Sequence, residues 1–339
     1  MINNVSIKNY KSVVDVSLPL GRFNLLIGAN GCGKSNILEG IALGAAASTD
    51  KLDYEYFSNR GIRLVEPRLM LPKFEDIDAK GIFVSFTNDH RVSFDICFNK
   101  NAKPAKWMLE MKTGEPDIPG LGQFLIYSLE ESKLRKADDS NRTYPIGLHG
   151  EGLFAYLKEL AQHPDSSEMF NEIKENLKIL DWFDDMEVPS GQLSMEFNLR
   201  LKDCYLPDEI YSFDQRSTNE GFLYLLFYYT LVISDETPKF FAIENIDTAF
   251  NPKLCREVVR RLIELARKHD KQIIATTHNP AVLDGLDLHD EEQKLMVVQR
   301  SVDGYTKVRT LNNKDIVKSD LSLSQLWLRG FIGGLPNNF

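Results

Sequence analysis

The sequence contains few cysteines, and they do not cluster. Only four occur among 339 residues, and no two of them have the short spacing that a zinc site requires. They are Cys32, Cys97, Cys204 and Cys255. Isolated thiols of this kind are typical of proteins in a reducing compartment, where disulfide bonds do not persist. We therefore expect a cytoplasmic protein with reduced cysteines.

The sequence also lacks long hydrophobic runs. Its longest apolar stretch, residues 222–234, is interrupted by tyrosines and is shorter than the roughly 20 residues that a membrane-spanning helix needs. The opening segment, MINNVSIKNYKS, contains no apolar core of the kind found in a secretory signal. These two absences predict a protein that does not associate with membranes.

An excess of positive charge is missing as well. The formal net charge is −9, which argues against coating of nucleic acid by the whole surface but leaves a local basic groove open. The hydrophobic content of 43% and the charged content of 26% are ordinary for a globular protein. A chain of this length can form one large domain, or two modest domains, with a sizeable core.

The first part of the chain reads as strands followed by a helix. The strand Phe23–Ile27 is continuously apolar, and a helix rich in Ile, Leu and Ala is predicted over residues 35–46. Residues 50–80 have no clear periodicity and are expected to be irregular. Further strands are predicted as a meander on one flank of the core sheet, at residues 81–86, 92–98 and 107–112.

The rest of the chain contains a helical stretch and then an alternation of strands and helices. The expected elements are helices over 152–183, 220–232 and Pro252–Lys268, strands at 193–201, 240–244 and Gln272–Thr276, and a hairpin of 295–299 with 307–311. This order predicts an α/β fold with a mainly parallel core sheet, flanking antiparallel strands and an inserted helical lobe. The predicted division is an N-terminal part (1–150), a lobe (151–190) and a C-terminal part (191–339).

Residues 28–35 form a phosphate-binding motif. They read GANGCGKS, which fits the pattern G-x-x-x-x-G-K-[ST], and they lie between an apolar strand and a helix as that pattern requires. Glycines let the backbone point N–H groups at phosphate oxygens, and the helix start adds the positive end of its dipole. Lys34 is expected to reach the β- and γ-phosphates and Ser35 to bind Mg²⁺. The predicted ATP-binding residues are Asn30, Gly31, Cys32, Gly33, Lys34, Ser35 and Asn36.

A second motif, KFFAIEN at residues 239–245, is an apolar strand that ends in an acid. An acid in this place meets the Mg²⁺ of a P-loop at the edge of a parallel sheet, so we assign Glu244 to the metal. At the next position, where a second acid usually orients the attacking water, Asn245 has no useful proton affinity near neutral pH. Asp247 is a candidate for partial substitution. The motif therefore predicts an ATPase with weak hydrolysis.

A third motif contains a histidine after the next predicted strand. His278 lies in ATTHNP and follows Glu244 by 34 residues. Adjacent parallel strands end at the same edge of a sheet, where an imidazole can sense the γ-phosphate of a bound nucleotide. The alternative interpretation of His278 is a structural histidine, but its place in the chain favours the sensor.

A fourth motif, STNEGF, precedes the predicted buried helix at residue 220. A small polar residue and a glycine at the start of a helix can form an anion site. We include Ser217, Asn219, Glu220 and Gly221 among the nucleotide-binding candidates, since in a head-to-tail dimer this helix start would face the γ-phosphate of the partner. The alternative is an ordinary helix cap.

The order of these motifs resembles that of ABC-type ATPase heads of the RecF, SMC and OLD kind. The opening IKNYKS at residues 7–12 and the loop NGCGKSN at residues 30–36 are similar to the corresponding segments of that group. Other segments resemble ATPase subunits of bacterial phage-defence systems, of the Septu type and its retron-associated relatives. These segments are FLIY (124–127), GLHGEGL (147–153), ENIDTAFNP (244–252) and LSLSQLWLRG (321–330).

The resemblance implies a role for each motif. Lys34, Ser35 and Glu244 would hold ATP and Mg²⁺, His278 would be the switch histidine, and the signature Asn219–Gly221 (or Ser217) would complete the site of a partner. Residues 246–252 would form a D-loop at the interface. This arrangement implies a homodimer or higher homo-oligomer that encloses nucleotide between its subunits.

The defence-system resemblance further implies control of a separate nuclease or toxin effector. No nuclease motif of the toprim or HNH kind is visible, and the roughly 60 residues after His278 are too few for a toprim domain. The alternative is a DNA-repair or chromosome-maintenance ATPase of the RecF/SMC kind, which acts on DNA by hydrolysis. Its supporting feature is a basic stripe made by Arg256, Arg260, Arg261, Arg267 and Lys268. A third possibility is a nucleotide-gated scaffold without hydrolysis.

Overall fold

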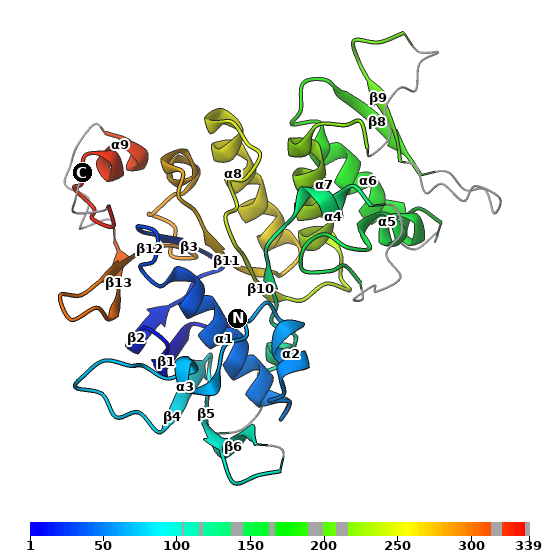
Figure 1. The fold of residues 1–339 in the computed structure, drawn as a ribbon. Helices are drawn as coiled ribbons and strands as arrows, with labels where there is room; N and C mark the ends of the chain where they lie inside the picture. The colour runs from blue at the N-terminus through cyan, green and yellow to red at the C-terminus, as the bar shows by residue number, and fades with distance from the viewer. Residues whose placement is uncertain are drawn as a thin grey trace.

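The computed structural model describes residues 1–103, 105–114, 118–136, 145–162, 167–188, 199–207, 216–312 and 321–335. Figure 1 shows the path of the chain. The strands are β1 (Asn4–Tyr10), β2 (Val13–Pro19), β3 (Phe23–Ile27), β4 (Gly81–Thr87), β5 (Arg91–Asn99), β6 (Lys106–Thr113), β7 (Ile126–Tyr127), β8 (Phe183–Glu187), β9 (Arg200–Asp203), β10 (Phe240–Ile243), β11 (Gln272–Thr276), β12 (Gln293–Arg300) and β13 (Thr306–Leu311).

The helices of the described residues are mostly short. They are α1 (Lys34–Ser48), α2 (Tyr54–Ser58), α3 (Pro67–Met70), α4 (Glu131–Leu134), α5 (Leu153–Gln162), α6 (Ser167–Leu177), α7 (Glu220–Ile233), α8 (Pro252–Lys268) and α9 (Leu323–Leu328), with 3-10 turns η1 (Leu121–Gln123) and η3 (Pro280–Gly285). Within these ranges, none is both long and apolar enough to cross a bilayer.

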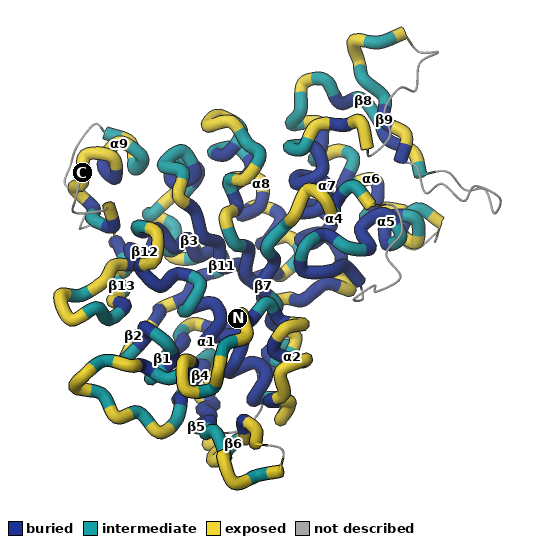
Figure 2. The backbone as a smooth tube through the Cα atoms, viewed as in Figure 1, coloured by how far each residue is buried: buried dark blue, intermediate teal, exposed yellow. Residues whose placement is uncertain are grey.

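The core sheet has the strand order β13-β12-β3-β11-β10-β7. Its strands from β12 to β7 run parallel, and β13 is an antiparallel edge strand. Every residue of β3 and β11 is buried, as expected for parallel strands that are covered on both faces. Figure 2 shows these central strands as the buried interior. The prediction of an α/β fold with a mainly parallel core sheet is confirmed.

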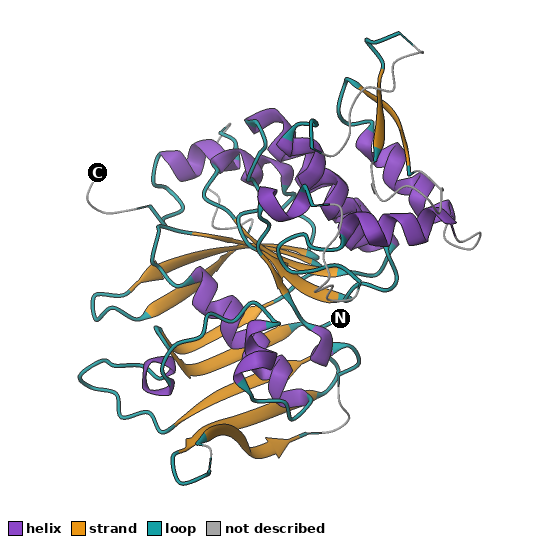
Figure 3. Ribbon diagram, turned by 45° about the vertical axis from the view of Figure 1, so that its right-hand side comes forward, coloured by secondary structure: helices purple, strands orange, loops and turns teal. Residues whose placement is uncertain are grey.

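A second sheet lies beneath the first, with α1 between them (Figure 3). This sheet is antiparallel and has the order β2-β1-β4-β5-β6. The meander expected at residues 81–112 is therefore present, but β4 pairs with β1 and extends this second sheet rather than the core sheet. Helix α1 is buried on almost all sides, which explains its Ala- and Leu-rich sequence. At Gly44 the helix approaches the sheet so closely that a β-carbon would lie 2.5 Å from Val84 Cγ1.

The opposite face of the core sheet carries α7 and α8, and the helical lobe packs beside α7 (Figure 1). The hairpin of β8 and β9 extends from this lobe. Its base contacts the first turn of α7, since the rings of Trp182 and Phe183 lie 5.7 and 5.6 Å from that of Phe222. Of the strand expected at 193–201, residues 193–198 lie outside the described residues, and β9 begins at Arg200.

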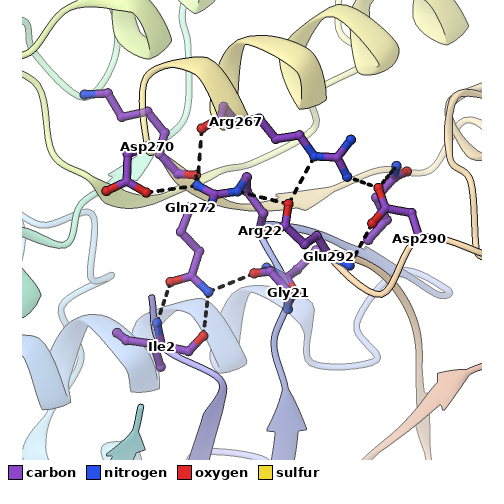
Figure 4. Close-up of polar contacts among 12 residues, drawn as sticks. Ile2, Gly21, Arg22, Arg267, Asp270, Gln272, Asp290 and Glu292 are labelled. Atoms are coloured by element: carbon purple, nitrogen blue, oxygen red, sulfur yellow. Dashed lines mark hydrogen bonds and ion pairs between the residues drawn. The ribbon is translucent and has the colours of Figure 1, made fainter. Parts of the chain in front are cut away.

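A polar network fixes the amino ends of the core strands (Figure 4). At the start of β11, the amide of Gln272 accepts a hydrogen bond from Ile2 N at 3.0 Å and donates one to Ile2 O at 2.6 Å. Glu292, just before β12, pairs with Arg22 at 3.2 Å and with Arg267 of α8 at 3.0 Å. These contacts connect four segments that are distant in sequence. They leave the carboxyl ends of the same strands open at the other edge of the sheet.

Candidate functional site

The carboxyl ends of three neighbouring strands bring the predicted motifs together. Strand β3 leads into the P-loop, β10 ends before Glu244, and β11 ends before His278, and these strands are parallel neighbours in the order β3-β11-β10. A cavity of about 290 Å³ lies at this edge. It is lined by Asn30, Gly31, Cys32, Gly33, Lys34, Ser35, Asn36, Arg63, Glu244, Asn245, Thr276, His278 and Arg300.

The P-loop side of the cavity offers positive charge and open N–H groups. The Lys34 ammonium donates to the carbonyl oxygens of Gly28 at 2.8 Å and Ala29 at 3.2 Å. Burial lowers the pKa of Lys34, and the nearby Cys32 and Glu244 oppose this shift. Helix α1 begins after Gly33 with no side-chain cap and no acid in its first turn, so its first N–H groups are available to an anion.

Two neighbouring segments fix the shape of the P-loop. Gly33 has φ 113°, a conformation that favours glycine, and a β-carbon there would lie 2.1 Å from Thr306 Oγ1. The Thr306 hydroxyl donates to Cys32 O at 3.0 Å and lies 2.7 Å from the hydroxyl of Ser12. Ser12 in turn accepts a hydrogen bond from the Asn36 amide at 2.7 Å. The start of β13 and the β1–β2 turn therefore hold the loop from one side.

The acidic side of the cavity is provided by Glu244. Its N–H donates to Tyr127 O at 2.8 Å, which fixes the backbone where the side chain enters the cavity. Among the described residues that line the cavity, Glu244 is the only carboxylate. The next residue, Asn245, has φ 51°, a left-handed conformation that Asn tolerates better than most side chains. Its N–H donates to Thr276 Oγ1 at 2.9 Å.

His278 lines the same cavity, two residues after the end of β11. The residue is exposed, yet partial burial lowers the pKa of His278 and the positive charge of Lys34 lowers it further, while the charge of Asp247 opposes the shift. The imidazole is therefore mainly neutral near pH 7. Asp247 does not line the cavity, because its carboxylate accepts a hydrogen bond from Thr277 Oγ1 at 2.6 Å. It contacts the segment that carries His278 rather than the space where nucleotide would bind.

The predicted signature residues lie away from this cavity, at the start of α7. Ser217 and Asn219 line a separate cavity of about 320 Å³ together with Trp182, Asp203 and Thr218. Asn219 caps the helix, since its side chain accepts a hydrogen bond from Phe222 N at 2.9 Å, and Glu220 occupies the first turn. A β-carbon on Gly221 would lie 3.2 Å from Ala249 O. The signature therefore lies against the 246–252 segment and not beside the P-loop of the same chain.

Two arginines of the cavity were not among the predicted site residues. Arg63 donates to the Asn36 side chain at 3.2 Å, and Arg300 donates to Gly31 O at 3.0 Å. Arg63 lies in the segment at residues 50–80, where no periodicity or motif marks it. Arg300 directly follows the strand predicted at 295–299, and the structure extends this strand to Arg300 as β12 and pairs it with β3.

The residues present fit a nucleoside triphosphate with Mg²⁺. Three cationic side chains and the uncapped start of α1 face the polyphosphate volume, and Ser35 and Glu244 are the groups that could bind the metal. No cluster of three or more His, Cys, Asp or Glu with metal-ligand geometry occurs in the described part of the chain. Mg²⁺ usually takes only one or two protein oxygens and fills its other positions with water and phosphate, so this pair is sufficient.

Two families match separate parts of the chain. Residues 1–112 match a family described as "AAA ATPase domain". Residues 209–284 match a family described as "AAA domain, putative AbiEii toxin, Type IV TA system". The first match contains the P-loop and Arg63, and the second contains the signature, Glu244 and His278. No curated protein sequence matches the chain.

Solved structures with a similar fold include three SMC heads. An SMC head bound to the C-winged helix domain of ScpA has a TM-score of 0.58 and 15% identity, over 93% of this chain and 99% of that chain. An SMC head domain with an extended coiled coil, from Pyrococcus furiosus and bound to the C-terminal domain of ScpA, has a TM-score of 0.59 and 14% identity, over 92% and 96%. The SMC head domain from Thermotoga maritima has a TM-score of 0.51 and 15% identity, over 92% and 99%. At this identity the likeness shows the fold alone, which is that of an SMC head, while the two matches to AAA ATPase families cover residues 1–112 and 209–284.

Proposed function

We propose that this protein is an ATP-binding subunit of a bacterial anti-phage defence complex. In this proposal it holds ATP as a conformational ligand, assembles with further copies of itself, and controls a separate nuclease or toxin. The observation that carries the proposal is the cavity that joins Lys34, Ser35, Glu244 and His278 at one edge of the core sheet. The function of each group follows from its place in that cavity.

The chain's own residues bind and orient the polyphosphate. The N–H groups at the start of α1 and the Lys34 ammonium donate to phosphate oxygens, and Arg63 and Arg300 add charge at the rim. Ser35 and Glu244 would hold Mg²⁺, which neutralises phosphate charge when bound. The neutral imidazole of His278 can donate one hydrogen bond toward the γ-phosphate. The preceding residue, Thr277, donates a hydrogen bond to Asp247, so a shift of His278 on nucleotide binding would also move the D-loop segment, residues 246–252.

Hydrolysis in this site is expected to be slow. A water that attacks the γ-phosphate needs a group to orient it or accept its proton, and Asn245 offers only an amide. Asp247 is held by Thr277, and Glu244 is required for the metal. ATP would then act mainly by binding one conformation of the assembly better than another.

The separation of the signature from the P-loop supports the proposed assembly. Ser217 and Asn219 lie outside the cavity that contains Lys34 of the same chain. A second copy related by a two-fold axis would bring its signature to the open side of the cavity, and the same contact would occur twice. This arrangement supports a homodimer with two enclosed nucleotides.

The defence role is supported by sequence resemblance rather than by the site. The segments at 147–153, 244–252 and 321–330 resemble ATPase subunits of phage-defence systems, and the description of the family matched by residues 209–284 names a toxin and a toxin–antitoxin system. An effector on another polypeptide is the consistent partner of such a subunit. Identification of a nuclease or toxin encoded beside this chain, and its co-purification with it, would test this part.

The central experiment measures ATP binding, assembly and turnover on the same purified chain. We expect labelled ATP to bind in the presence of Mg²⁺, native mass to increase with ATP, and turnover to stay below the ~1 s⁻¹ that marks slow enzymes. A turnover above that value that is lost in Lys34→Ala would contradict the slow-hydrolysis part. Failure of ATP to bind would contradict the proposal as a whole.

The alternative of a DNA-acting ATPase depends on the basic stripe of α8. In the structure Arg256 and Arg260 both pair with Glu257, and Arg261 pairs with Glu264. Farther along the helix, the remaining two cations pair with acids of other segments. The positive charge of the stripe is thus locally compensated. Duplex DNA binding that weakens steeply with salt and stimulates turnover would favour the alternative.

A further inference from the structure

Helix α1 contains a buried carboxylate close to the P-loop. Glu39 follows Ser35 by one helical turn and is only 1% exposed, within a helix whose other buried side chains are mostly apolar. Glutamate is almost never buried to this extent unless partners compensate its charge. The position therefore needs an explanation that the packing of α1 alone does not supply.

Three donor side chains from two other segments meet at Glu39, and the backbone N–H of Arg63 also donates to its Oε1 at 3.4 Å. The Tyr10 hydroxyl donates to Oε2 at 3.0 Å, the Lys11 ammonium contacts the same oxygen, and Arg63 Nε contacts Oε1. Burial raises the pKa of Tyr10, and the charge of Glu39 raises it further, so the phenol remains a donor. Tyr10 and Lys11 belong to the IKNYKS segment, whose role the nucleotide motifs do not explain.

The backbone of that segment is held in a costly conformation to make these contacts. Lys11 has φ 49°, in the left-handed region that residues with a β-carbon seldom adopt. The Lys11 N–H donates to Met70 O at 2.8 Å, which fixes the turn. With its side chain only 12% exposed, the Lys11 ammonium lies against Glu39 rather than in solvent.

Arg63 is the member of this cluster that reaches the nucleotide cavity. Its Nε faces Glu39, its Nη2 donates to Asn36 Oδ1 at 3.2 Å, and 63% of its side chain is exposed. Burial lowers the pKa of Arg63, but the hydrogen bond and charge of Glu39 outweigh burial and raise it. The guanidinium is a planar fork, so a carboxylate on its inner edge also fixes the direction of its outer N–H groups.

We propose that Glu39 is a positioning residue for nucleotide binding, which holds Arg63 at the cavity rim so that its free N–H groups meet the phosphates of ATP. The inference rests on the proposed ATP site and adds to it a residue that touches no nucleotide. Without the carboxylate, Arg63 must be ordered by the nucleotide itself, and that ordering reduces affinity.

A double-mutant cycle with a matched control tests this role. Glu39→Gln and Arg63→Ala are each expected to weaken binding of labelled ATP about tenfold, as for loss of an oriented charged contact, and the double variant should lose no more than either alone. Tyr10→Phe removes a different donor to Glu39 and leaves the Arg63 contact in place. It is expected to lower the melting temperature while ATP affinity stays within about twofold of wild type. Glu39→Asp serves in the cycle if Glu39→Gln does not fold.

The outcomes separate this inference from the proposed function. Additive losses in the cycle, or an equal loss of affinity in Tyr10→Phe, would overturn the positioning role while ATP binding by the wild-type chain stands. Absence of ATP binding by the wild-type chain would overturn the proposed function and this inference together. Non-additive losses with an unaffected Tyr10→Phe variant support Glu39 as the residue that orients Arg63.

Discussion

The starts of α1 and α7 are built in opposite ways. Helix α1 begins with no side-chain cap and no acid in its first turn, whereas α7 is capped by Asn219 and has Glu220 in its first turn. The first arrangement leaves N–H groups and dipole open to an anion, and the second satisfies one N–H group internally and adds negative charge. Within a single chain, the start of α1 therefore offers an anion site, whereas the start of α7 does not.

This difference suggests how nucleotide and assembly are related. The cavity at α1 contains its own cations, an acid that could hold the metal and a histidine, so we expect it to bind ATP before any partner arrives. In the proposed dimer, the start of α7 would contribute only to a phosphate that another copy already holds. It also contacts the D-loop segment, since the Phe250 ring lies 6.4 Å from that of Tyr224 and 6.1 Å from that of Tyr228. Binding at α1 and assembly at α7 should therefore be separable by mutation.

The largest effect is expected from Lys34→Ala. Loss of the ammonium removes charged hydrogen bonds to the phosphates, worth about 4 kcal/mol in total, and should weaken ATP binding about 1,000-fold. Titration of labelled ATP into the monomeric variant measures this. As a control, Asn219→Ser should leave ATP binding by the single chain unchanged. A comparable loss in both variants would mean that the two ends are not separable.

A second prediction concerns the far end of α7. The buried Lys271 ammonium donates to Ser234 O at 2.6 Å, Thr237 O at 2.9 Å and Pro238 O at 3.4 Å, just beyond the last turn of that helix. Lys271→Met leaves the carbonyls of Thr237 and Pro238 without this donor, while Ser234 O keeps the Thr237 hydroxyl at 2.8 Å, and the change should reduce the free energy of unfolding by about 3 kcal/mol. Denaturant unfolding measures the loss. An unchanged midpoint would show that water replaces the ammonium.

Lys271 also predicts a dependence of stability on pH. Burial, with the charge of Lys239, lowers the pKa of Lys271 from 10.5 to about 7. Between these values the unfolded chain binds more protons than the folded chain, so the free energy of unfolding should rise with pH by up to about 4 kcal/mol from pH 7 to 10. Lys271→Met should lack this rise. A wild-type profile parallel to that of the variant would mean that the carbonyl contacts keep the ammonium charged throughout.

The role of the signature at the start of α7 is tested by a charge change that preserves the helix cap. Asp caps a helix as well as Asn, so Asn219→Asp should leave the melting temperature unchanged. Its added negative charge would face the phosphates of a partner, and we expect ATP-dependent assembly to weaken about tenfold, as for a like-charge contact of about 1.4 kcal/mol. Native mass as a function of protein concentration measures this. Equal assembly by Asn219→Asp and Asn219→Ser would place the signature outside the interface.

A carboxylate can be introduced beside Glu244, in the cavity that contains the P-loop, without backbone strain. Asn245 has φ 51°, which Asp tolerates and Glu tolerates poorly, so Asn245→Asp is the better test of the missing second acid. We expect turnover to rise about tenfold, since general-base assistance lowers the barrier by at least 1.4 kcal/mol. Asn245→Gly keeps the backbone conformation without the carboxylate and should stay at the wild-type rate. A rise in both variants would point to loop mobility instead.

Local sequence signals predicted much of this fold. β3, α8 and β11 have the predicted bounds, because apolar runs bordered by turn residues, and the Asn251-Pro252 start of α8, are local signals. The pairing of β4 with β1 had no such signal, since the sheet that a meander joins depends on distant contacts. The same reason applies to the site: the motifs marked Lys34, Glu244 and His278, but not Arg63.

The buried cluster shows why such residues escape sequence reasoning. Glu39 and Arg63 are 24 residues apart in sequence, and their contact arises only because the irregular segment after α2 folds back onto α1. A charged residue within an otherwise apolar helix was the available hint for Glu39. It indicates that a partner exists without indicating which residue the partner is.

The smallest predicted effect compares two buried threonines, one beside the P-loop and one in the last turn of α7. Thr306 Oγ1 donates to Cys32 O of the P-loop at 3.0 Å, and Thr230 Oγ1 donates to Leu226 O within α7 at 2.7 Å. Thr230→Val removes one buried hydrogen bond and should lower stability by about 1 kcal/mol, whereas Thr306→Val also removes the contact with the Ser12 hydroxyl and should lower it by about 2 kcal/mol. Only Thr306→Val should also weaken ATP binding, about threefold, since it alone releases the loop that carries the phosphate-binding N–H groups. Calorimetric unfolding and ATP titration on both variants measure the two effects. An equal change in ATP affinity in the two variants would show that general stability, rather than the shape of the P-loop, determines the affinity.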